Sequence, residues 1–578
     1  MENERNDEDI LAKVRGYFES AVQSAAYTAW REEAQEAWAF YDGRQWSGEE
    51  VEKLAESGQP AIVINKIAAK VDNIAGTEVA GRTRILYRSR SGEAQEEATA
   101  RAVTDLALYV AERNDQALEV SGMFRAGLVT GIGWLDVGVE AAAEGAFIFN
   151  RVEDEMAVVW DPMSRRADMS DARFVCRERW LDEEEAKALF PDQAEQVLKN
   201  IALGLGRGHG RMAYALSGAK DVSYADSARK LVRVVEVQYK RTEQLYSVRK
   251  VDGSKLATFD KKAAQTVGEE VESNAVPRVY VAYFSENVLL SHTPLPYSHN
   301  RFTLLPYVFK RDRKDGKPYG LVRMAIDPQR ELNKRRSKAM HLLNTAQVIA
   351  DIDAVEDPAL LAKEAARPDG LILKRPGKEL RIIRNSDLAQ SQVAVMDQAA
   401  KDIQEVMGVF DETLGKTSNA ASGIAIQQRQ MAGTLNQMFA FDALRRTKKE
   451  LGLQVLELIR QYFTHEMVVQ ITDDVQSARL VRLNTPQLLA DGTTMVEHDV
   501  QRGVFDIHVE EVRDVLSSRE LDIQQLNVLM AAGVPIPPKL LVEATSVKNK
   551  AEILRSLEAA AAPVLPAENK QPIVKQGE

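Results

Sequence analysis

Lys317-Pro-Tyr-Gly320 is followed by Asp327-Pro-Gln329, and at this point the character of the sequence changes. Asp followed by Pro is typical of a helix start, because Asp caps free N–H groups and Pro is tolerated in the first turn. We therefore predict a helix with Asp327 as its N-cap, running to about Gln347. This start separates a mixed first half of the chain from a mainly helical second half.

The first half mixes helical and β-type patterns. Helices are expected over 7–40, from Pro60 to about Gly76, and over 94–114 and 117–130. From about 133 to 316 the pattern changes to short alternating runs typical of strands, namely Phe147–Arg151, Val158–Trp160, Phe174–Trp180, Val232–Tyr239, Leu245–Val248 and Val279–Phe284. Glu286-Asn287 predicts a hairpin turn, and residues 202–229 predict a mobile loop.

The second half predicts long helices that are interrupted by small elements. Residues 348–390 form an insertion, with β-type runs Leu371–Lys374 and Leu380–Ile383 and a short helix after Pro358. A helix over 391–409, a polar loop over 411–423 and a proline-free helix over Ile424–Phe463 follow, the last about 60 Å long with bends at Gly433 and Gly452. Phe505–Glu510 predicts a strand, 519–561 a helical block, and the tail from Pro563 a disordered segment.

Composition excludes several classes of protein. The chain has 578 residues, of which 45% are hydrophobic and 28% charged, as in globular proteins of several domains. The acidic N-terminus is not a signal peptide, and no stretch reaches the ~18 apolar residues of a membrane span. Cys176 is the single cysteine, so an internal disulfide is excluded. A net charge of −11 predicts weak binding to nucleic acid.

Motifs in the sequence that could support catalysis lack the residue spacing that such chemistry requires. Gly415-Lys416-Thr417 resembles part of a phosphate-binding loop, but that loop needs a glycine where Phe410 stands. Asp351, Asp353, Glu356 and Asp357 could bind a divalent metal, although such runs usually mark a solvated surface. The histidines show no ligand spacing. We therefore expect no enzyme activity, no metal and no cofactor.

Charge distinguishes the two helices that flank the insertion. Residues 319–347 carry six basic side chains against Asp327 and Glu331, and residues 391–412 carry five acidic ones against Lys401. We therefore predict that the two helices pack together, within a subunit or between neighbours. The predicted interface residues are Arg330, Lys334, Arg335, Arg336, Lys338, Asp397, Asp402 and Glu405. A basic stripe that faces DNA is the alternative.

The order of these segments resembles the portal proteins of phages, most closely those of short-tailed podoviruses. The resemblance covers about 1–560, and it rests on Lys317–Gly320, Asp327–Gln329 with Asn333, Asn419–Arg429, Phe505–Glu511 and Ser517–Glu520. It implies an α+β, mainly helical portal fold. The chain ends about fifteen residues after its last expected helix, which argues against the long barrel helix of some members.

The resemblance also implies a division of the chain into named parts. These are a mixed α+β wing with a β-rich hub (1–316), a first stem helix (317–347), a small α/β clip (348–390), a second stem helix (391–410), a tunnel loop (411–423), a long helix and return to the wing (424–511), a helical crown (512–562) and a disordered tail (563–578). Lys416, Thr417, Ser418 and Asn419 of the tunnel loop would line the DNA channel, and Arg367, Lys374 and Arg375 of the clip would dock the motor and adaptor.

The implied function is that of a portal vertex in the virion, assembled in the bacterial cytoplasm. A ring of about twelve copies would pass double-stranded DNA during packaging and ejection, binding it weakly and without sequence specificity. The implied partners are the terminase large subunit, the head-completion or tail adaptor, the major capsid protein and the scaffolding protein, with no membrane. A metal-dependent phage nuclease and a scaffold without nucleic acid are the alternatives, and an image of the purified protein would distinguish a ring from a compact monomer.

Overall fold

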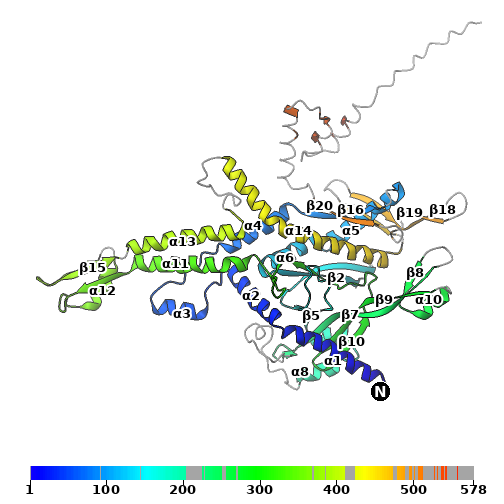
Figure 1. Cartoon of the computed structure of the whole chain (residues 1–578), viewed down its shortest axis with the longest axis horizontal. Coiled ribbons are helices and arrows are strands. Elements are labelled where there is room, and N and C mark those ends of the chain that lie inside the picture. Colours follow the sequence, from blue (N-terminus) through cyan, green and yellow to red (C-terminus); the bar gives the residue numbers. More distant parts are fainter. Residues whose placement is uncertain are drawn as a thin grey trace, which may run out of the picture. The chain divides into compact units, whose positions relative to one another are not determined.

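A computed structural model of the chain describes most of it, and the described residues are 2–90, 93–142, 145–202, 224–226, 228–249, 255–267, 271–367, 370–384, 386–410, 423–465, 467–472, 478–488, 494–497, 500, 505–511 and isolated positions between 526 and 557. The chain divides into two compact units, Met1–Glu78 with Ile85–Val509, and Val79–Arg84 with Glu510–Glu578. The first unit mixes helices with small sheets, as expected (Figure 1). None of the described helices is long and apolar enough to cross a lipid bilayer.

The N-terminal region is more divided than the sequence predicted. The single helix expected over 7–40 is two helices, α1 (Glu2–Val22) and α2 (Ala25–Tyr41), because Ser24 caps α2 by accepting the N–H of Tyr27 at 3.2 Å. An unexpected helix, α3 (Gly48–Glu56), begins at a capping box between Ser47 and Glu50. The helix expected from Pro60 is wrong in its first turns: residues 60–66 are extended, and α4 spans Ile67–Ala80.

The largest sheet is antiparallel and has the strand order β10-β9-β7-β5-β4. Its members are β4 (Val158–Trp160), β5 (Phe174–Leu181), β7 (Leu231–Arg249), β9 (Val271–Ser285) and β10 (Val288–Pro294), with β6 (Ala225–Asp226) and β8 (Lys255–Thr258) paired to β7. The two runs predicted around 240 form one long strand, β7. The hairpin at Glu286 is confirmed, with a positive φ of 51° at that residue.

A second sheet has the order β11-β2-β3 and packs against a predicted helix. It consists of β2 (Ile132–Ala142), β3 (Gly145–Glu153) and β11 (Leu304–Val308). The helices expected over 94–114 and 117–130 are confirmed as α5 (Ala94–Arg113) and α6 (Gln116–Thr130). Phe124 of α6 meets Tyr307 of β11 edge to face, with ring centroids 5.3 Å apart, inside the main hydrophobic core.

One buried arginine joins the two sheets. Arg177 of β5 donates to Glu236 of β7 at 3.1 Å, to Glu153 of β3 at 2.8 Å, and to Asp136 of β2. Replacing Arg177 would leave buried carboxylates of both sheets without their shared partner, so this cluster makes the placement of β2 and β3 on the large sheet specific.

The helix that follows Lys317–Gly320 begins earlier than the sequence predicted. A 3₁₀ turn, η1 (Val322–Ala325), runs directly into α11 (Ile326–Asn344). Asp327 is therefore not the N-cap; it lies in the first turn, where its exposed carboxylate meets Arg330 at 3.4 Å. Pro328 remains in that turn, where a missing N–H removes no helical hydrogen bond.

The remaining elements of the second half follow the predicted order with shifted boundaries. The strand predicted at Leu371–Lys374 is wrong: these residues belong to no strand, and β14 (Ala346–Ala350) pairs with β15 (Leu380–Arg384) instead. The helix expected from 391 is α13 (Ser386–Met407), and the long proline-free helix is confirmed as α14 (Gly423–Tyr462), which continues through Gly433 and Gly452.

Short elements complete the fold. They are α7 (Glu183–Leu189), α8 (Ala194–Ala202), α10 (Lys261–Val267), α12 (Pro358–Ala366), β1 (Thr83–Ser89), the pair β12 (Lys310–Arg311) and β13 (Pro318–Tyr319), the pair β16 (Met467–Thr472) and β17 (Ala478–Leu483), the pair β18 (Thr485–Leu488) and β19 (Thr494–Glu497), and β20 (Phe505–Glu511), which pairs with β1. The strand expected at Phe505–Glu510 is confirmed. The expected tail and, apart from isolated positions, the expected crown lie outside the described residues.

A ladder of buried polar side chains holds the extended segment 60–66 along α11. Gln329, Asn333 and Ser337 are at most 1% exposed. They accept the backbone N–H groups of Lys66, Ile64 and Ile62 at 3.1, 3.0 and 3.3 Å. Gln329 also donates to the Ile64 carbonyl at 2.8 Å, and Asn333 donates to Gln45 at 2.6 Å. We call these three residues the polar ladder.

Replacing one residue of the polar ladder should destabilise the fold. In Asn333→Ala, the Ile64 N–H and the side-chain Oε1 atom of Gln45 lose their partner, and an unsatisfied buried polar group costs about 1–3 kcal/mol. We expect a clearly lower melting temperature in thermal unfolding. Glu331→Ala, on the same helix but exposed, removes only its ion pair with Arg335, worth about 0.2–0.5 kcal/mol, and is the control. Equal melting temperatures for the two variants would contradict a structural role for the ladder.

Candidate functional site

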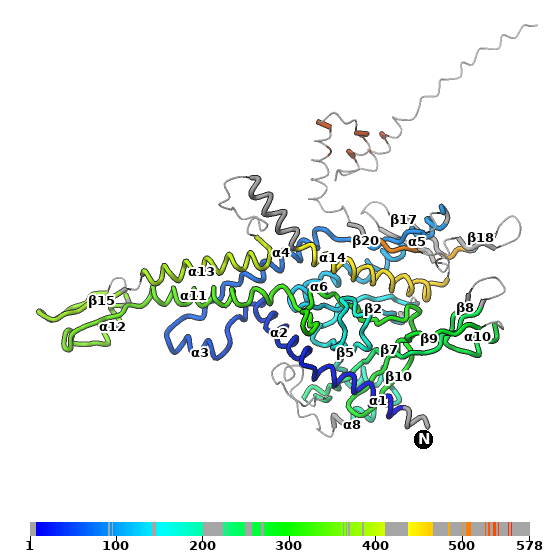
Figure 2. The backbone as a smooth tube through the Cα atoms, in the orientation of Figure 1, coloured from blue at the N-terminus to red at the C-terminus, as the bar shows by residue number. Residues whose placement is uncertain are grey.

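Two antiparallel helices and the small element at their end form the candidate site. Helices α11 and α13 lie side by side, and residues 345–385 between them carry α12 and the pair β14–β15 (Figure 2). The strand register runs from Ala346 opposite Arg384 to Ala350 opposite Leu380. We call residues 345–385 the tip.

Acidic residues of the tip have structural partners. Asp357 caps α12 by accepting the N–H groups of Ala359 and Leu360 at 2.8 and 3.2 Å. Asp351 accepts the N–H of Glu379 at 2.8 Å. Within the described part of the chain, no group of three or more His, Cys, Asp or Glu is arranged to hold a metal ion. These contacts favour the interpretation of this run as a structural loop over that of a nuclease centre.

Apolar side chains are unusually exposed on the tip and on α13. Eleven of the 21 large hydrophobic side chains that are exposed in the described residues lie between 343 and 406. Ile352, Leu371 and Leu373 are 89%, 74% and 77% exposed. Large apolar side chains that are exposed in such number along one region are typical of a protein–protein interface, so this region is the strongest candidate for one in the described structure.

The cations predicted for docking lie on the tip but do not form a single cluster of contacts. Arg367 meets Glu364 at 3.4 Å, and the Lys374 ammonium donates to the Lys378 carbonyl at 3.3 Å. The side chain of Arg375 is exposed, and its backbone N–H donates to the Ala354 carbonyl at 2.9 Å. All three cations are therefore accessible to a partner.

Two basic side chains of α11 have their partners on the N-terminal helices. Arg330 pairs with Glu36 of α2, and Lys334 pairs with Glu50 of α3 at 3.1 Å. Arg335 meets Glu331 of its own helix at 3.1 Å. Arg336 and Lys338 have no ion pair within 4.0 Å among the described residues. The positive charge of α11 is thus partly neutralised by α2 and α3, which the sequence did not indicate as its partners.

The acidic residues of α13 do not pair with α11 in this chain. Asp397 and Glu405 are exposed, and Asp402 accepts a hydrogen bond from Gln398 at 2.8 Å. In the described structure these three acids form no ion pair, and the polar contact between the predicted interface residues and α13 is Arg335 to Gln392 at 3.2 Å. The charge complementarity between the helices therefore remains a prediction for contacts between subunits.

The model of the phage P22-like portal protein family matches residues 15–577. The chain belongs to this family. A portal protein of Helicobacter pylori bacteriophage KHP30 is 23% identical over 175 residues, which cover 29% of this chain and 28% of that protein. The family membership confirms the portal fold expected from the order of the segments.

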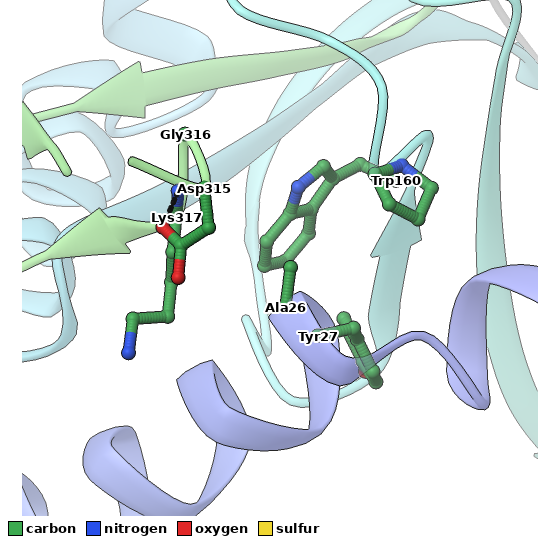
Figure 3. A pocket seen from close by; sticks show the side chains of 7 residues that line it. Ala26, Tyr27, Trp160, Asp315, Gly316 and Lys317 are labelled. Carbon is green, nitrogen blue, oxygen red and sulfur yellow. Dashed lines mark hydrogen bonds between the residues drawn. The ribbon is translucent and has the colours of Figure 1, made fainter. Parts of the chain in front are cut away.

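In this portal family member, the segment Lys317–Gly320 contributes to packing. Lys317 is 7% exposed and pairs with Glu33 of α2. A Cβ atom on Gly320 would lie 2.1 Å from the Val129 carbonyl oxygen, so only glycine fits there. Asp315, Gly316 and Lys317 face Tyr27 and Trp160 across a pocket of about 10 Å³, which has room for a single water molecule (Figure 3). The segment Lys317–Gly320 positions the start of α11.

The predicted tunnel-loop residues Lys416, Thr417, Ser418 and Asn419 lie outside the described residues. Just before that loop, the carbonyl of Val409 accepts a hydrogen bond from the buried ammonium of Lys70 in α4. Sequence reasoning missed Lys70, because a lone lysine in a helix carries no signal of burial. It also missed the polar ladder, although the polar residues at 329, 333 and 337 recur at every fourth position.

Apolar side chains of the tip should be dispensable for folding and needed for assembly. We expect Leu371→Asp combined with Leu373→Asp to keep its circular dichroism and melting temperature, because both side chains are already in water. Its ring fraction in sedimentation velocity should fall severalfold, since charges would enter an apolar contact. Leu118→Asp with Leu189→Asp, 64% and 59% exposed elsewhere, is the matched control. Normal assembly of the tip variant would exclude this surface from the interface.

Proposed function

We propose that this protein forms the portal vertex, a ring of about twelve copies through which double-stranded DNA enters and leaves the capsid. The exposed apolar surface of α13 and the tip carries the proposal, because a single chain leaves it in water and a ring of chains would cover it. Membership of the portal family supports the same assembly. Portal proteins are structural, and we propose no catalytic activity for this chain.

The charge of the chain suits a conduit for DNA. A channel rich in Lys and Arg would neutralise many phosphates and hold DNA with a steep dependence on salt. The net charge of −11 avoids such retention, while Lys416 offers one positive charge per subunit in the proposed tunnel loop. Thr417, Ser418 and Asn419 can donate hydrogen bonds to phosphate oxygens without reading bases. DNA would therefore be held weakly and without sequence specificity.

The tip is the proposed docking surface for the packaging and tail proteins. Its place at the end of the helix pair and its accessible cations Arg367, Lys374 and Arg375 support this assignment. The terminase large subunit would bind there during packaging, and the head-completion or tail adaptor afterwards. The major capsid and scaffolding proteins would surround the ring in the virion, which is assembled in the host cytoplasm.

Imaging of the purified full-length protein tests the ring. We expect negative-stain electron microscopy to show rings with a central hole, and about twelve subunits per ring in class averages. Buried apolar area between copies provides the driving force, so the rings should resist moderate salt. Monomers at all concentrations would overturn the proposal, and magnesium-dependent cleavage of DNA by the monomer would favour the nuclease alternative.

The proposed tunnel loop is tested in phage particles. Lys416→Glu replaces the one base of the loop by an acid, and repulsion of phosphates should reduce full-length genomes per particle severalfold while rings still form. Lys314→Glu, at an exposed lysine in the turn between β12 and β13, makes the same change of charge and is the control. Normal amounts of packaged DNA in Lys416→Glu would remove the loop from the mechanism.

A further inference from the structure

Helix α3 is attached to the protein by polar contacts and buries none of its residues. Glu50 accepts the N–H of Ser47 at 3.1 Å and meets Lys334 of α11 at 3.1 Å, and these contacts hold the pKa of Glu50 below its ordinary value. Just beyond the other end of α3, the Gly58 carbonyl meets the Nδ1 atom of His341 at 3.2 Å. Val51 on this helix is 41% exposed. The position of α3 is therefore fixed, although it contributes nothing to the core.

An open groove of about 550 Å³ lies between α3 and α11, and we call it the α3–α11 groove. Trp46 and Leu54 provide apolar lining, and four cations stand against the single acid Glu50; the lining residues are Trp46, Glu50, Lys53, Leu54, Gln59, Lys334, Arg335, Lys338 and Gln392. The other three glutamates of α3, Glu49, Glu52 and Glu56, do not line it. The groove is thus positively charged with an apolar patch, and it suits an acidic helix that also carries apolar side chains.

The outer face of α13 has the complementary composition. Its acids Asp397, Asp402 and Glu405 form no ion pair in the described structure. Val395 and Val406, each 40% exposed, are on the same helix. In Figure 1, α3 and α13 lie on either side of α11, and Gln392 of α13 also borders the groove, whereas these three acids do not line it. Two different complementary surfaces on one subunit can close a ring by head-to-tail contacts.

We infer that the α3–α11 groove of each subunit receives the acidic outer face of α13 from its neighbour in the ring. The inference rests on the proposed portal assembly and adds a role for α3 and Lys53, which belong to the N-terminal region and not to the helix pair. The apolar patch supplies burial, and the charges determine the register and reject a reversed neighbour. DNA is the competing occupant of a basic groove, but the apolar lining and the in-chain pairing of Lys334 with Glu50 favour a protein helix.

Two charge-reversed variants test the contact. Lys53→Glu with Lys338→Glu makes the groove acidic, and Asp402→Lys with Glu405→Lys makes the outer face of α13 basic. Alone, each variant should form severalfold fewer rings than the unmodified chain, because like charges would meet at every contact. Mixed in equal amounts, they should form rings that contain both variants in alternation, since each contact then joins opposite charges. Native mass spectrometry of the mixed rings measures their composition.

Controls separate this inference from the proposed function. Lys261→Glu with Lys262→Glu on α10 makes the same change of charge on exposed lysines away from the groove and should form normal rings. Recovery of rings on mixing shows that both variants fold. Normal rings from the groove variant alone would overturn the inference while leaving the portal function standing. Normal rings that retain less DNA would assign the groove to DNA and would equally overturn it. Absence of rings from the unmodified chain would instead contradict the proposed function.

Discussion

The polar ladder on α11 is the constraint on which the arrangement of the other helices depends. Four residues of helix rise about 6.0 Å, and two residues of extended chain rise about 6.6 Å, so side chains at every fourth helical position meet alternate N–H groups of the segment 60–66. This match satisfies partly buried backbone N–H groups that a sheet would otherwise satisfy. It also fixes the route from α2 and α3 into α4, and with it the place of Lys70 before the proposed tunnel loop.

Electrostatic contacts around α11 explain why its basic character does not repel the rest of the fold. Glu33, Glu36 and Glu50 of the N-terminal region meet Lys317, Arg330 and Lys334. The two more exposed pairs, Arg330–Glu36 and Lys334–Glu50, contribute at most about 1 kcal/mol each, so they orient α2 and α3 more than they stabilise them. In the described structure the acids Asp397, Asp402 and Glu405 of α13 form no ion pair, and large apolar residues of the tip are exposed. The proposed ring would use both for contacts between subunits.

Much of the fold was predicted from the hydrophobic periodicity of the segments and from the turn-forming residues between them. The strands around 147, 158, 174 and 279, the hairpin at Glu286 and the long helix α14 lie where the patterns placed them. Two errors had different causes. Asp327 did not cap its helix, because the preceding 3₁₀ turn continued into it, whereas residues 60–66 were held in an extended form by the ladder. Contacts distant in sequence decided the second case, and no local pattern reports such contacts.

The sequence by itself determined the order of the elements, the absence of a catalytic motif with correct spacing, and the resemblance to portal proteins, since these depend on local pattern and composition. Only the tertiary structure decided which charges meet. The basic stripe of α11 was visible in the sequence, yet its partners proved to be Glu36 and Glu50, about 290 residues away along the chain. Pairing depends on distance in space, which one-dimensional charge patterns do not contain, whereas helix and strand periods are properties of neighbouring residues.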